Sequence, residues 1–172
     1  MRELRYSVAA SLDGYIAGPN GEFDWIDVDP EIDFDAMYAR FGGLVMGRRS
    51  YEVYVATGGG GGPQMPVYVY SRTLPEGERD EVVVARDAVS HVRQLKAQAG
   101  RPLWLWGGGD LFRQLADAGL VDGVEVAILP ILLGGGVQLL PAPAARIRLR
   151  LRAQRLFSKT GTLLLDYDVV PS

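Results

Sequence analysis

Residues 103–110 read Leu-Trp-Leu-Trp-Gly-Gly-Gly-Asp, a short apolar run that stops at three consecutive glycines. An apolar run of this length between Pro102 and Gly107 is typical of a buried strand. Apolar residues then recur at helical spacing up to Gly119, and glycine is the residue that most often ends a helix. The stretch therefore predicts a strand, a glycine turn and a helix, followed by a further strand over residues 124–129.

The glycine turn has two interpretations. Gly107, Gly108 and Gly109 have no side chains to keep a ligand from the backbone, and the first amides of the next helix point out of its end. A helix end of this kind binds anions, phosphates in particular. A tight turn that needs a left-handed backbone would use the same residues. The turn alone leaves both a phosphate site and a purely structural role open.

Composition predicts one globular domain over residues 1–172, since the chain is 48% hydrophobic and 23% charged. A net charge of −3 disfavours nucleic acid as a partner, because such proteins carry a basic footprint. The absence of cysteine excludes disulfides and thiolate metal sites, and a single histidine, His91, argues against zinc, so we expect no metal. No apolar run approaches the ~20 residues of a membrane helix, and no signal-peptide core follows Met1. We therefore expect a cytoplasmic protein without a membrane partner.

The other elements alternate along the chain. A helix is expected to open at Pro30 and end before Gly42, and a second, amphipathic helix covers residues 88–98. Apolar runs predict further strands at residues 5–10, 44–46, 67–70 and 81–85, and a terminal pair at 147–157 and 162–170. The pattern predicts a three-layer α/β fold with a mixed central sheet flanked by helices and a C-terminal antiparallel hairpin.

Three details of this pattern carry expectations of their own. Ser50 is placed to cap a short helix around residues 51–55. Arginines alternate with apolar residues over 146–152, so one face of that strand should be buried and the other basic and solvated. Five consecutive glycines, Gly58 to Gly62, form a loop that is either slack or a mobile segment near a ligand.

Ligand-type residues follow three of the predicted strands, at 47–50, 71–73 and 107–110. In an open α/β sheet, ligands bind beyond the carboxyl ends of the strands, so these residues should border one crevice. The glycine turn would take a pyrophosphate. Arg48, Arg49 and Arg72 are natural partners of an extra ribose phosphate, because a guanidinium matches phosphate geometry with two hydrogen bonds. The combination favours NADP over NAD.

Acidic residues are concentrated between Asp27 and Asp35. They could supply a general acid or a site for a hard cation, and a solvated helix start would explain them equally. His91 lies among the apolar residues of its helix, and no nucleophile or carboxylate pattern points to it, which disfavours a catalytic triad.

Five motifs occur in order with compatible spacing. They are Ser-Leu-Asp-Gly-Tyr-Ile-Ala at 11–17, Met-Gly-Arg-Arg-Ser-Tyr-Glu at 46–52, Tyr-Ser-Arg at 70–72, Trp-Gly-Gly-Gly-Asp at 106–110 and Leu-Pro-Ile-Leu-Leu-Gly-Gly-Gly at 129–136. Over nearly the whole chain the set resembles the dihydrofolate reductase superfamily. It is most similar to the C-terminal reductase domain of the bifunctional riboflavin-biosynthesis deaminase-reductase. Tyr15 stands where that family usually has lysine, and no deaminase domain is present.

The resemblance implies NADPH as cofactor, a dihydrofolate-reductase-like fold and a homodimer. Gly47, Arg48, Arg49 and Ser50 would hold the adenosine phosphate and pyrophosphate side, and Ser71 and Arg72 would flank the adenosine end. Gly107, Gly108, Gly109 and Asp110 would hold the pyrophosphate, with a cis Gly107–Gly108 peptide bond. Ala9 and Ile16 would contact the nicotinamide. A helix carboxylate, with Asp33 as the candidate, would donate a proton.

The implied activity is a 5-amino-6-(5-phosphoribosylamino)uracil reductase type of reaction, with hydride passing from NADPH to a ribosylaminopyrimidine or a related small molecule. Two alternatives stay open, namely dihydrofolate reduction and binding of NADP without catalysis. The residues alone name neither the substrate nor the surface that would pair in a dimer.

Overall fold

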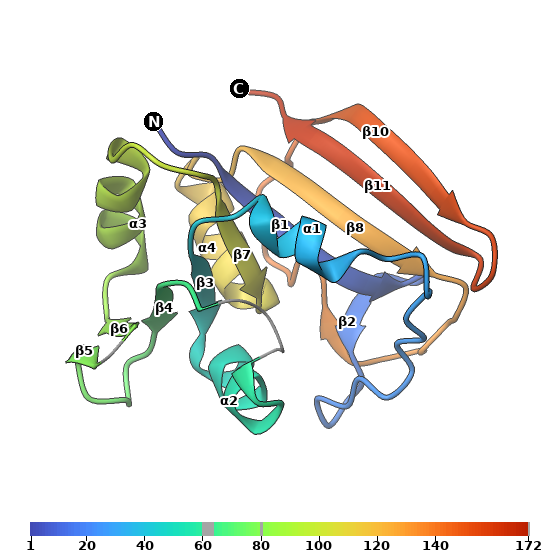
Figure 1. Ribbon diagram of the computed structural model, residues 1–172, viewed down its shortest axis with the longest axis horizontal. Coiled ribbons are helices and arrows are strands. Elements are labelled where there is room, and N and C mark those ends of the chain that lie inside the picture. Colours follow the sequence, from blue (N-terminus) through green and yellow to red (C-terminus); the bar gives the residue numbers. More distant parts are fainter. Residues whose placement is uncertain (60–63, 80, 172) are drawn as a thin grey trace.

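A computed structural model describes residues 1–59, 64–79 and 81–171 of the chain. The described residues form a nine-stranded sheet in the order β10-β11-β8-β1-β7-β3-β4-β6-β5, and a small second sheet that pairs β2 with β9 (Figure 1). The strands are β1 Leu4–Ser11, β2 Tyr15–Ala17, β3 Leu44–Gly47, β4 Val67–Tyr70, β5 Gly77–Arg79, β6 Val82–Ala85, β7 Leu103–Gly107, β8 Gly123–Leu129, β9 Val137–Gln138, β10 Leu149–Phe157 and β11 Thr162–Val169. The helices are α1 Phe34–Ala39, α2 Arg48–Ala56, α3 Ala88–Ala97 and α4 Gly109–Asp117.

The central part of the sheet is parallel, from β8 through β1, β7, β3 and β4 to β6. The strands β11 and β10 extend it as an antiparallel hairpin beside β8. All the parallel strands end at the same edge, so the segments that follow them lie close together. This is the mixed sheet with a terminal hairpin that the sequence predicts, and the predicted fold class is confirmed.

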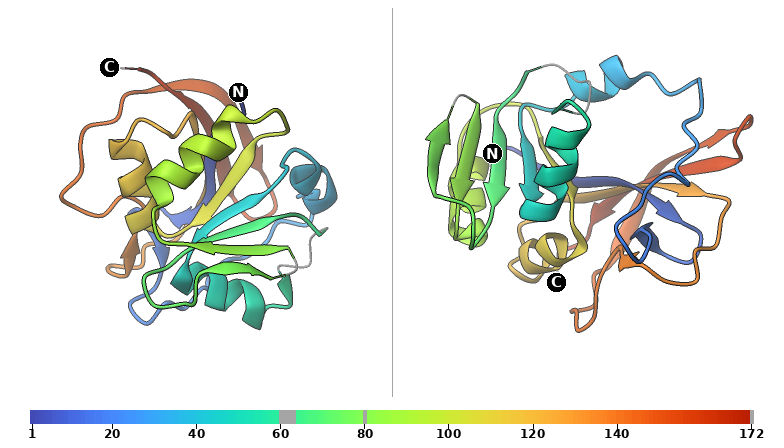
Figure 2. Two further views of the ribbon diagram at one scale, coloured as in Figure 1. Left: turned by 90° about the vertical axis from the view of Figure 1, so that its left-hand side faces the viewer. Right: turned by 90° about the horizontal axis from the view of Figure 1, so that it is seen from below.

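The helices lie on both faces of the sheet and make three layers. Helix α1 lies over one face, and α3 and α4 lie over the other (Figure 2). Each face has its own apolar cluster, with Phe41 and Trp104 in stacked contact on the α1 side and Tyr6 and Phe112 stacked on the α4 side. These clusters fix the parallel strands, and with them the strand ends that form the site.

The helix expected from Pro30 begins later, at Phe34. The Asp29 side chain accepts a hydrogen bond from the Glu31 amide at 2.9 Å, which holds residues 29–32 in a turn. Asp33 then caps the helix by accepting a hydrogen bond from the Ala36 amide at 2.9 Å. Short acidic side chains compete in this way with the helical backbone, so the first acidic residues form a loop and not a helical turn.

The terminal hairpin also differs from expectation. β10 was expected to bury its apolar face, yet Leu149 and Leu151 are 42% and 50% exposed. The reason is topological, because β10 is the outer strand of the sheet and the helices lie over the strands from β8 to β6 (Figures 1 and 2). An alternating pattern on an edge strand therefore does not by itself mark a buried face.

The loop after β1 is fastened to the loop after β8. The Asp13 carboxylate accepts hydrogen bonds from the backbone amides of Leu133 and Gly134, at 3.1 and 2.7 Å. The Ser11 hydroxyl donates to Asp13 at 2.6 Å, and this hydrogen bond is the main cause that lowers the Asp13 pKa. The β2–β9 pairing continues the same contact, so two loops at the carboxyl edge of the sheet are joined to each other.

Among the described residues, no helix has the length and apolarity that a membrane crossing requires. Of the five-glycine run, Gly60 to Gly62 fall outside the described residues.

Candidate functional site

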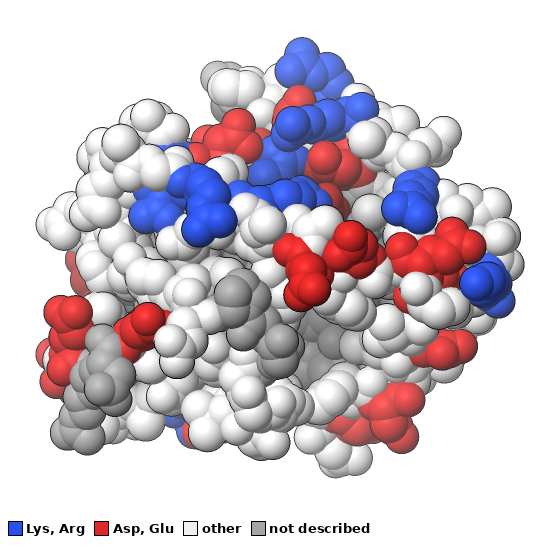
Figure 3. Space-filling model, viewed as in Figure 1, with Lys and Arg blue, Asp and Glu red and all other residues white. Residues whose placement is uncertain are grey.

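A large cleft opens at the carboxyl edge of the parallel strands. Its volume is about 2330 Å³, larger than the roughly 300–1,000 Å³ of a typical site for one small molecule. Figure 3 views the molecule from the α1 side, where acidic side chains gather on α1 and the loop before it, below a group of basic side chains. Every residue proposed from the sequence lines this cleft. They are Ala9, Ile16, Asp33, Gly47, Arg48, Arg49, Ser50, Ser71, Arg72, Gly107, Gly108, Gly109 and Asp110.

Two helices begin at the cleft without a side-chain cap. The N-cap residues of α2 and α4 are Gly47 and Gly108, which have no side chain to make a capping hydrogen bond. The first amides of a helix have no partner within the helix, and together with the helix dipole they attract negative charge. Two such ends on adjacent strands, β3 and β7, make this part of the cleft suited to a molecule with more than one phosphate.

Ser50 connects the two helix ends. Its hydroxyl oxygen accepts a hydrogen bond from the Gly108 amide at 3.2 Å. The expected capping role was wrong, because α2 begins at Arg48 and Ser50 lies inside its first turn. The hydroxyl therefore points across to the glycine turn and sets the distance between the two helix ends.

Gly47 and Gly109 each have a different structural reason for being glycine. A side chain at Gly47 would meet no atom within 4 Å, so this residue leaves open space in the cleft. A side chain at Gly109 would instead collide with the carbonyl oxygen of Gln138 and lie 2.9 Å from Pro141 Cδ. Gly109 is therefore needed for packing, and Gly47 is free to admit a ligand.

The peptide bond between Gly107 and Gly108 is trans, and the cis bond among the described residues is Ala142–Pro143. The cis glycine bond that the resemblance implied is therefore absent from this structure. Trans is the ordinary state of a bond that does not precede proline, and the Ser50 contact to Gly108 is made with the bond in that state.

The three arginines that the sequence proposes as phosphate partners, Arg48, Arg49 and Arg72, are in different states. Arg48 forms an ion pair with Glu52 at 2.6 Å on the surface of α2. The side chains of Arg49 and Arg72 are exposed and have no hydrogen bond or ion pair within the described part of the chain. Two guanidinium groups are thus available to an anion, and Arg48 can reach one only by exchanging its contact with Glu52.

Ser71 has a role in its own loop. Its hydroxyl oxygen accepts hydrogen bonds from the amides of Thr73 and Leu74, at 3.1 and 3.0 Å. The side chain is buried, and it fixes the turn that brings Arg72 to the cleft. Its hydroxyl is therefore committed to the loop in this structure.

The opposite end of the cleft is apolar near β1 and β2. Ala9 on β1 pairs with Ala127 on β8, and both residues line the cleft. Ile16 on β2 lines it as well and packs against the main apolar cluster. Small and apolar residues at this end leave room for a flat ring against the sheet.

Asp33 lies at the rim of the cleft as the exposed cap of α1. This contact gives Asp33 a structural role and leaves its proposed role as proton donor a prediction. Asp29, in the same acidic stretch, is bound by the Thr160 hydroxyl at 3.0 Å. Desolvation acts to raise the Asp29 pKa, but hydrogen bonds from Glu31 and Thr160 outweigh it, so the Asp29 pKa is lowered. Within the residues that the structure describes, no group of three or more side chains could hold a metal ion.

Sequence reasoning missed a buried carboxylate of the cleft, Glu125 on β8. Its side chain is 6% exposed, lines the cleft and is held by Ser7 and Arg40. The available signal was a charged residue inside the apolar run 124–129, at a position where a buried strand would ordinarily carry an apolar side chain.

Comparison with known proteins agrees with this geometry. Residues 2–162 match the RibD C-terminal domain family, so the chain belongs to that family. The uncharacterized protein YyaP of Bacillus subtilis is 30% identical over 96% of this chain and 94% of its own length. Members of the family are NADPH-dependent reductases, and NADP(H) is the cofactor typical of it.

Two solved structures extend the comparison to the fold. A putative riboflavin biosynthesis protein from Shewanella sp. PV-4 has a TM-score of 0.83 at 27% identity and covers 99% of this chain and 100% of its own. Dihydrofolate reductase from Enterococcus faecalis, complexed with NADP(H) and RAB-propyl, has a TM-score of 0.72 at 15% identity. The match covers 98% of this chain and 97% of that reductase. The chain therefore has a dihydrofolate-reductase-like fold, as the sequence predicts.

Proposed function

We propose that this protein is a cytoplasmic NADPH-dependent reductase of the 5-amino-6-(5-phosphoribosylamino)uracil reductase type, which transfers hydride to a ribosylaminopyrimidine or a related compound. The observation that carries the proposal is the pair of helix ends without capping side chains, beside Arg49 and Arg72, whose side chains bind no other described residue, in one cleft. The match to the RibD C-terminal domain family supports it.

The residues of the cleft fit NADPH. The amides at the starts of α2 and α4 would bind the pyrophosphate, and Arg72 or Arg49 would bind the 2′-phosphate that distinguishes NADPH from NADH. The open space at Gly47 lets the phosphates approach the backbone. At the other end, Ala9 and Ile16 would orient the nicotinamide ring.

When bound, the cofactor supplies the hydride, and the work of the protein is to hold two molecules together and exclude water. The loops fastened by Asp13 form the wall beside Ile16, and their hydrogen bonds keep that wall in place. Hydride transfer to a carbonyl or imine also needs a proton, for which Asp33 stays the candidate from sequence.

The proposal is tested by following NADPH oxidation with 5-amino-6-(5-phosphoribosylamino)uracil and, separately, with dihydrofolate. Turnover of the pyrimidine supports the proposed activity. Turnover of dihydrofolate alone would replace it with dihydrofolate reduction. Tight binding of NADPH without turnover of either would favour a protein that binds NADP without catalysis.

We also propose that the protein is a homodimer. The edge strand β10 exposes Leu149, Leu151 and Leu156, and an unpaired apolar edge can pair with a second chain. Light scattering after size-exclusion chromatography tests this, and a monomer at micromolar concentration would contradict it.

A further inference from the structure

A buried polar group lies on the wall of the cleft under α1, and the cofactor does not account for it. Glu125 on β8 is 4% exposed and Ser7 on β1 is 7% exposed. The Ser7 hydroxyl donates a hydrogen bond to Glu125 Oε1 at 2.7 Å. Arg40, which follows α1, donates to Oε2 at 3.0 Å and to Oε1 at 3.4 Å. All three of these residues line the cleft.

The sheet register places this group next to the proposed nicotinamide site. Ser7 pairs with Glu125, and two residues further along the same strands Ala9 pairs with Ala127. Alternate residues of a strand share a face, and two residues advance by about 6.6–6.8 Å. A ring bound against a nicotinamide at Ala9 would therefore have its far edge close to Glu125.

The surroundings of Glu125 favour recognition over support of the fold. A buried carboxylate with an ionic partner contributes little net stability, because taking the Glu125 charge out of water costs about as much as the attraction to Arg40 returns. An apolar side chain on β8 would fill the position at least as well. Its neighbours on the cleft wall include Trp104, whose indole nitrogen donates to the Ser7 carbonyl at 2.7 Å, so the strand is held rigidly behind the carboxylate.

The carboxylate still has capacity to accept hydrogen bonds. Two carboxylate oxygens offer about four acceptor positions, and the described residues donate three hydrogen bonds to Glu125, one from Ser7 and two from Arg40. The Arg40 side chain is 44% exposed, so it can leave the pair and be solvated. A ligand that enters under α1 can thus reach Glu125 Oε2 and take over the position of the Arg40 guanidinium.

We propose that Glu125 is a specificity-determining residue that accepts hydrogen bonds from paired N–H donors of the substrate. The substrate class is then a heterocycle with an amino group beside a ring nitrogen that carries hydrogen or takes up a proton next to the carboxylate, and compounds with acceptors alone are rejected. Ser7 orients the carboxylate, and Arg40 neutralises it until the substrate binds. This inference rests on the proposed function for the place of the nicotinamide.

A direct test compares two small probes by calorimetry with NADPH present. The probes are 2,4-diaminopyrimidine, which offers N–H donors, and 2,4-dimethylpyrimidine, which has the same outline and offers none. Hydrogen bonds to a charged group correspond to roughly a ten- to a hundredfold change in affinity. We expect the wild type to prefer the diamino compound by that factor and Glu125→Gln to lose the preference.

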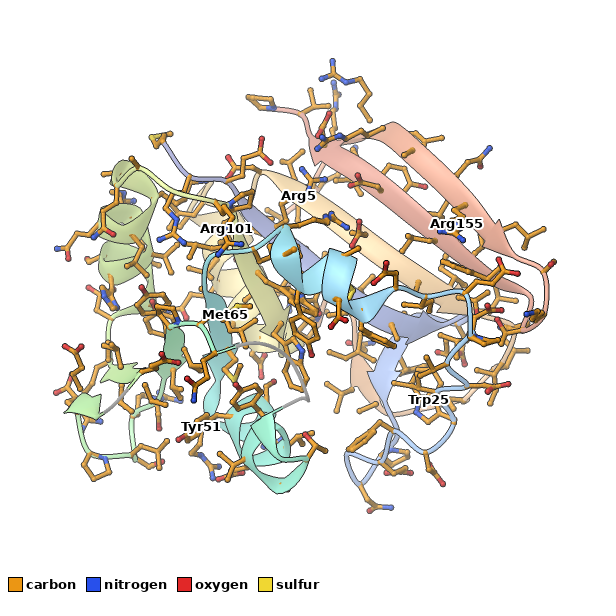
Figure 4. All side chains as sticks on the ribbon, in the orientation of Figure 1. Arg5, Trp25, Tyr51, Met65, Arg101 and Arg155 are labelled. Carbon is orange, nitrogen blue, oxygen red and sulfur yellow. The ribbon has the colours of Figure 1, made fainter. Side chains whose placement is uncertain are left out.

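Asp168→Asn is the matched control. Asp168 on β11 forms ion pairs with Arg5 and Arg150, at 3.6 and 3.8 Å, but does not line the cleft. Arg5, labelled in Figure 4, lies on β1 beside β8, so the control changes a carboxylate in the neighbouring ion-pair network of the same sheet. We expect Asp168→Asn to keep the preference, and its loss in this variant as well would overturn the assignment.

If Glu125→Gln does not fold, Arg40→Ala tests the same idea with the carboxylate in place. Removing the competing guanidinium should tighten binding of the diamino compound severalfold, and unchanged or weaker binding would overturn the proposal. Equal probe affinities in the wild type and Glu125→Gln would also overturn it. Failure of the wild type to bind NADPH would instead contradict the proposed function, so the two failures are distinguishable.

Discussion

Two glycines of the cleft should respond in opposite ways to the same substitution. Gly47→Ala adds a methyl group with no atom within 4 Å, at a backbone φ of −80° that any residue adopts. The free energy of unfolding should therefore stay within about 0.5 kcal/mol of the wild type. The methyl group enters the space that the phosphates would occupy, so affinity for NADPH should fall by about tenfold or more, equivalent to about 1.4 kcal/mol.

Gly109→Ala should have the reverse effect on stability. The new methyl group would collide with the Gln138 carbonyl and lie 2.9 Å from Pro141 Cδ. Overpacking costs about 1–3 kcal/mol, and the lower entropy of the unfolded chain returns about 0.4–1 kcal/mol. The central values of these two ranges leave a net loss of about 1.3 kcal/mol, which corresponds to a fall in Tm of about 3–5 °C for a chain of this size.

Urea denaturation of both variants, followed by titration with NADPH, tests the pair. Gly47→Ala that binds NADPH as tightly as the wild type would refute the placement of the phosphates at α2. Gly109→Ala with unchanged stability would refute the close packing of the glycine turn on residues 138–141.

Three further results are expected. Ser50→Ala loses its hydrogen bond to the Gly108 amide and should be destabilised by about 0.5–1.5 kcal/mol, measured by urea denaturation; no change would show that the contact is not formed in solution. Arg72→Gln should weaken NADPH binding and leave NADH binding unchanged, measured by calorimetry; an equal loss for both would remove Arg72 from the 2′-phosphate. The folded state lowers the Asp13 pKa, chiefly through the Ser11 hydroxyl, so the ionised carboxylate stabilises the fold at neutral pH. That contribution should disappear as the pH falls below about 4, and acid unfolding of Asp13→Asn should lack it; identical acid-unfolding curves would contradict this.

The sequence predicts the parallel core well because each buried strand is a short run of consecutive apolar residues. The strand at 67–70 agrees at both ends, and those at 44–46 and 103–106 are each one residue longer in the structure. Apolar runs bounded by glycine or proline carry this information without reference to distant residues.

The remaining features depend on partners that are distant in the chain. β2 and β9 exist because residues 15–17 meet residues 137–138, and no local pattern marks either segment. The start of α1 depends on the hydrogen bonds that the Asp29 and Asp33 carboxylates accept from backbone amides. Helix propensity does not predict which amide each carboxylate binds. Serine is a common N-cap residue, but the Ser50 hydroxyl accepts its hydrogen bond from the Gly108 amide at the start of another helix.

The sequence predicts only part of the site, because some of its residues follow strands in the chain and others are recognised only by partners that are distant in the chain. Glycines and arginines that follow strands are visible in the sequence, and the structure places them all on one cleft. Glu125 was missed because a single charged residue in an apolar strand gives no sign of its partners. Ser7 and Arg40 are 118 and 85 residues away from it in the chain, and only the fold brings them together.

The most direct test of the account is titration of the protein with NADPH and with NADH, following tryptophan fluorescence. Trp106 is partly buried and lines the cleft beside the glycine turn, so it should report occupancy. One charge-assisted phosphate contact predicts that NADPH binds roughly ten- to a hundredfold more tightly than NADH. Equal affinities would remove the arginines from the 2′-phosphate, and binding of neither nucleotide would contradict the central claim that this cleft is a cofactor site.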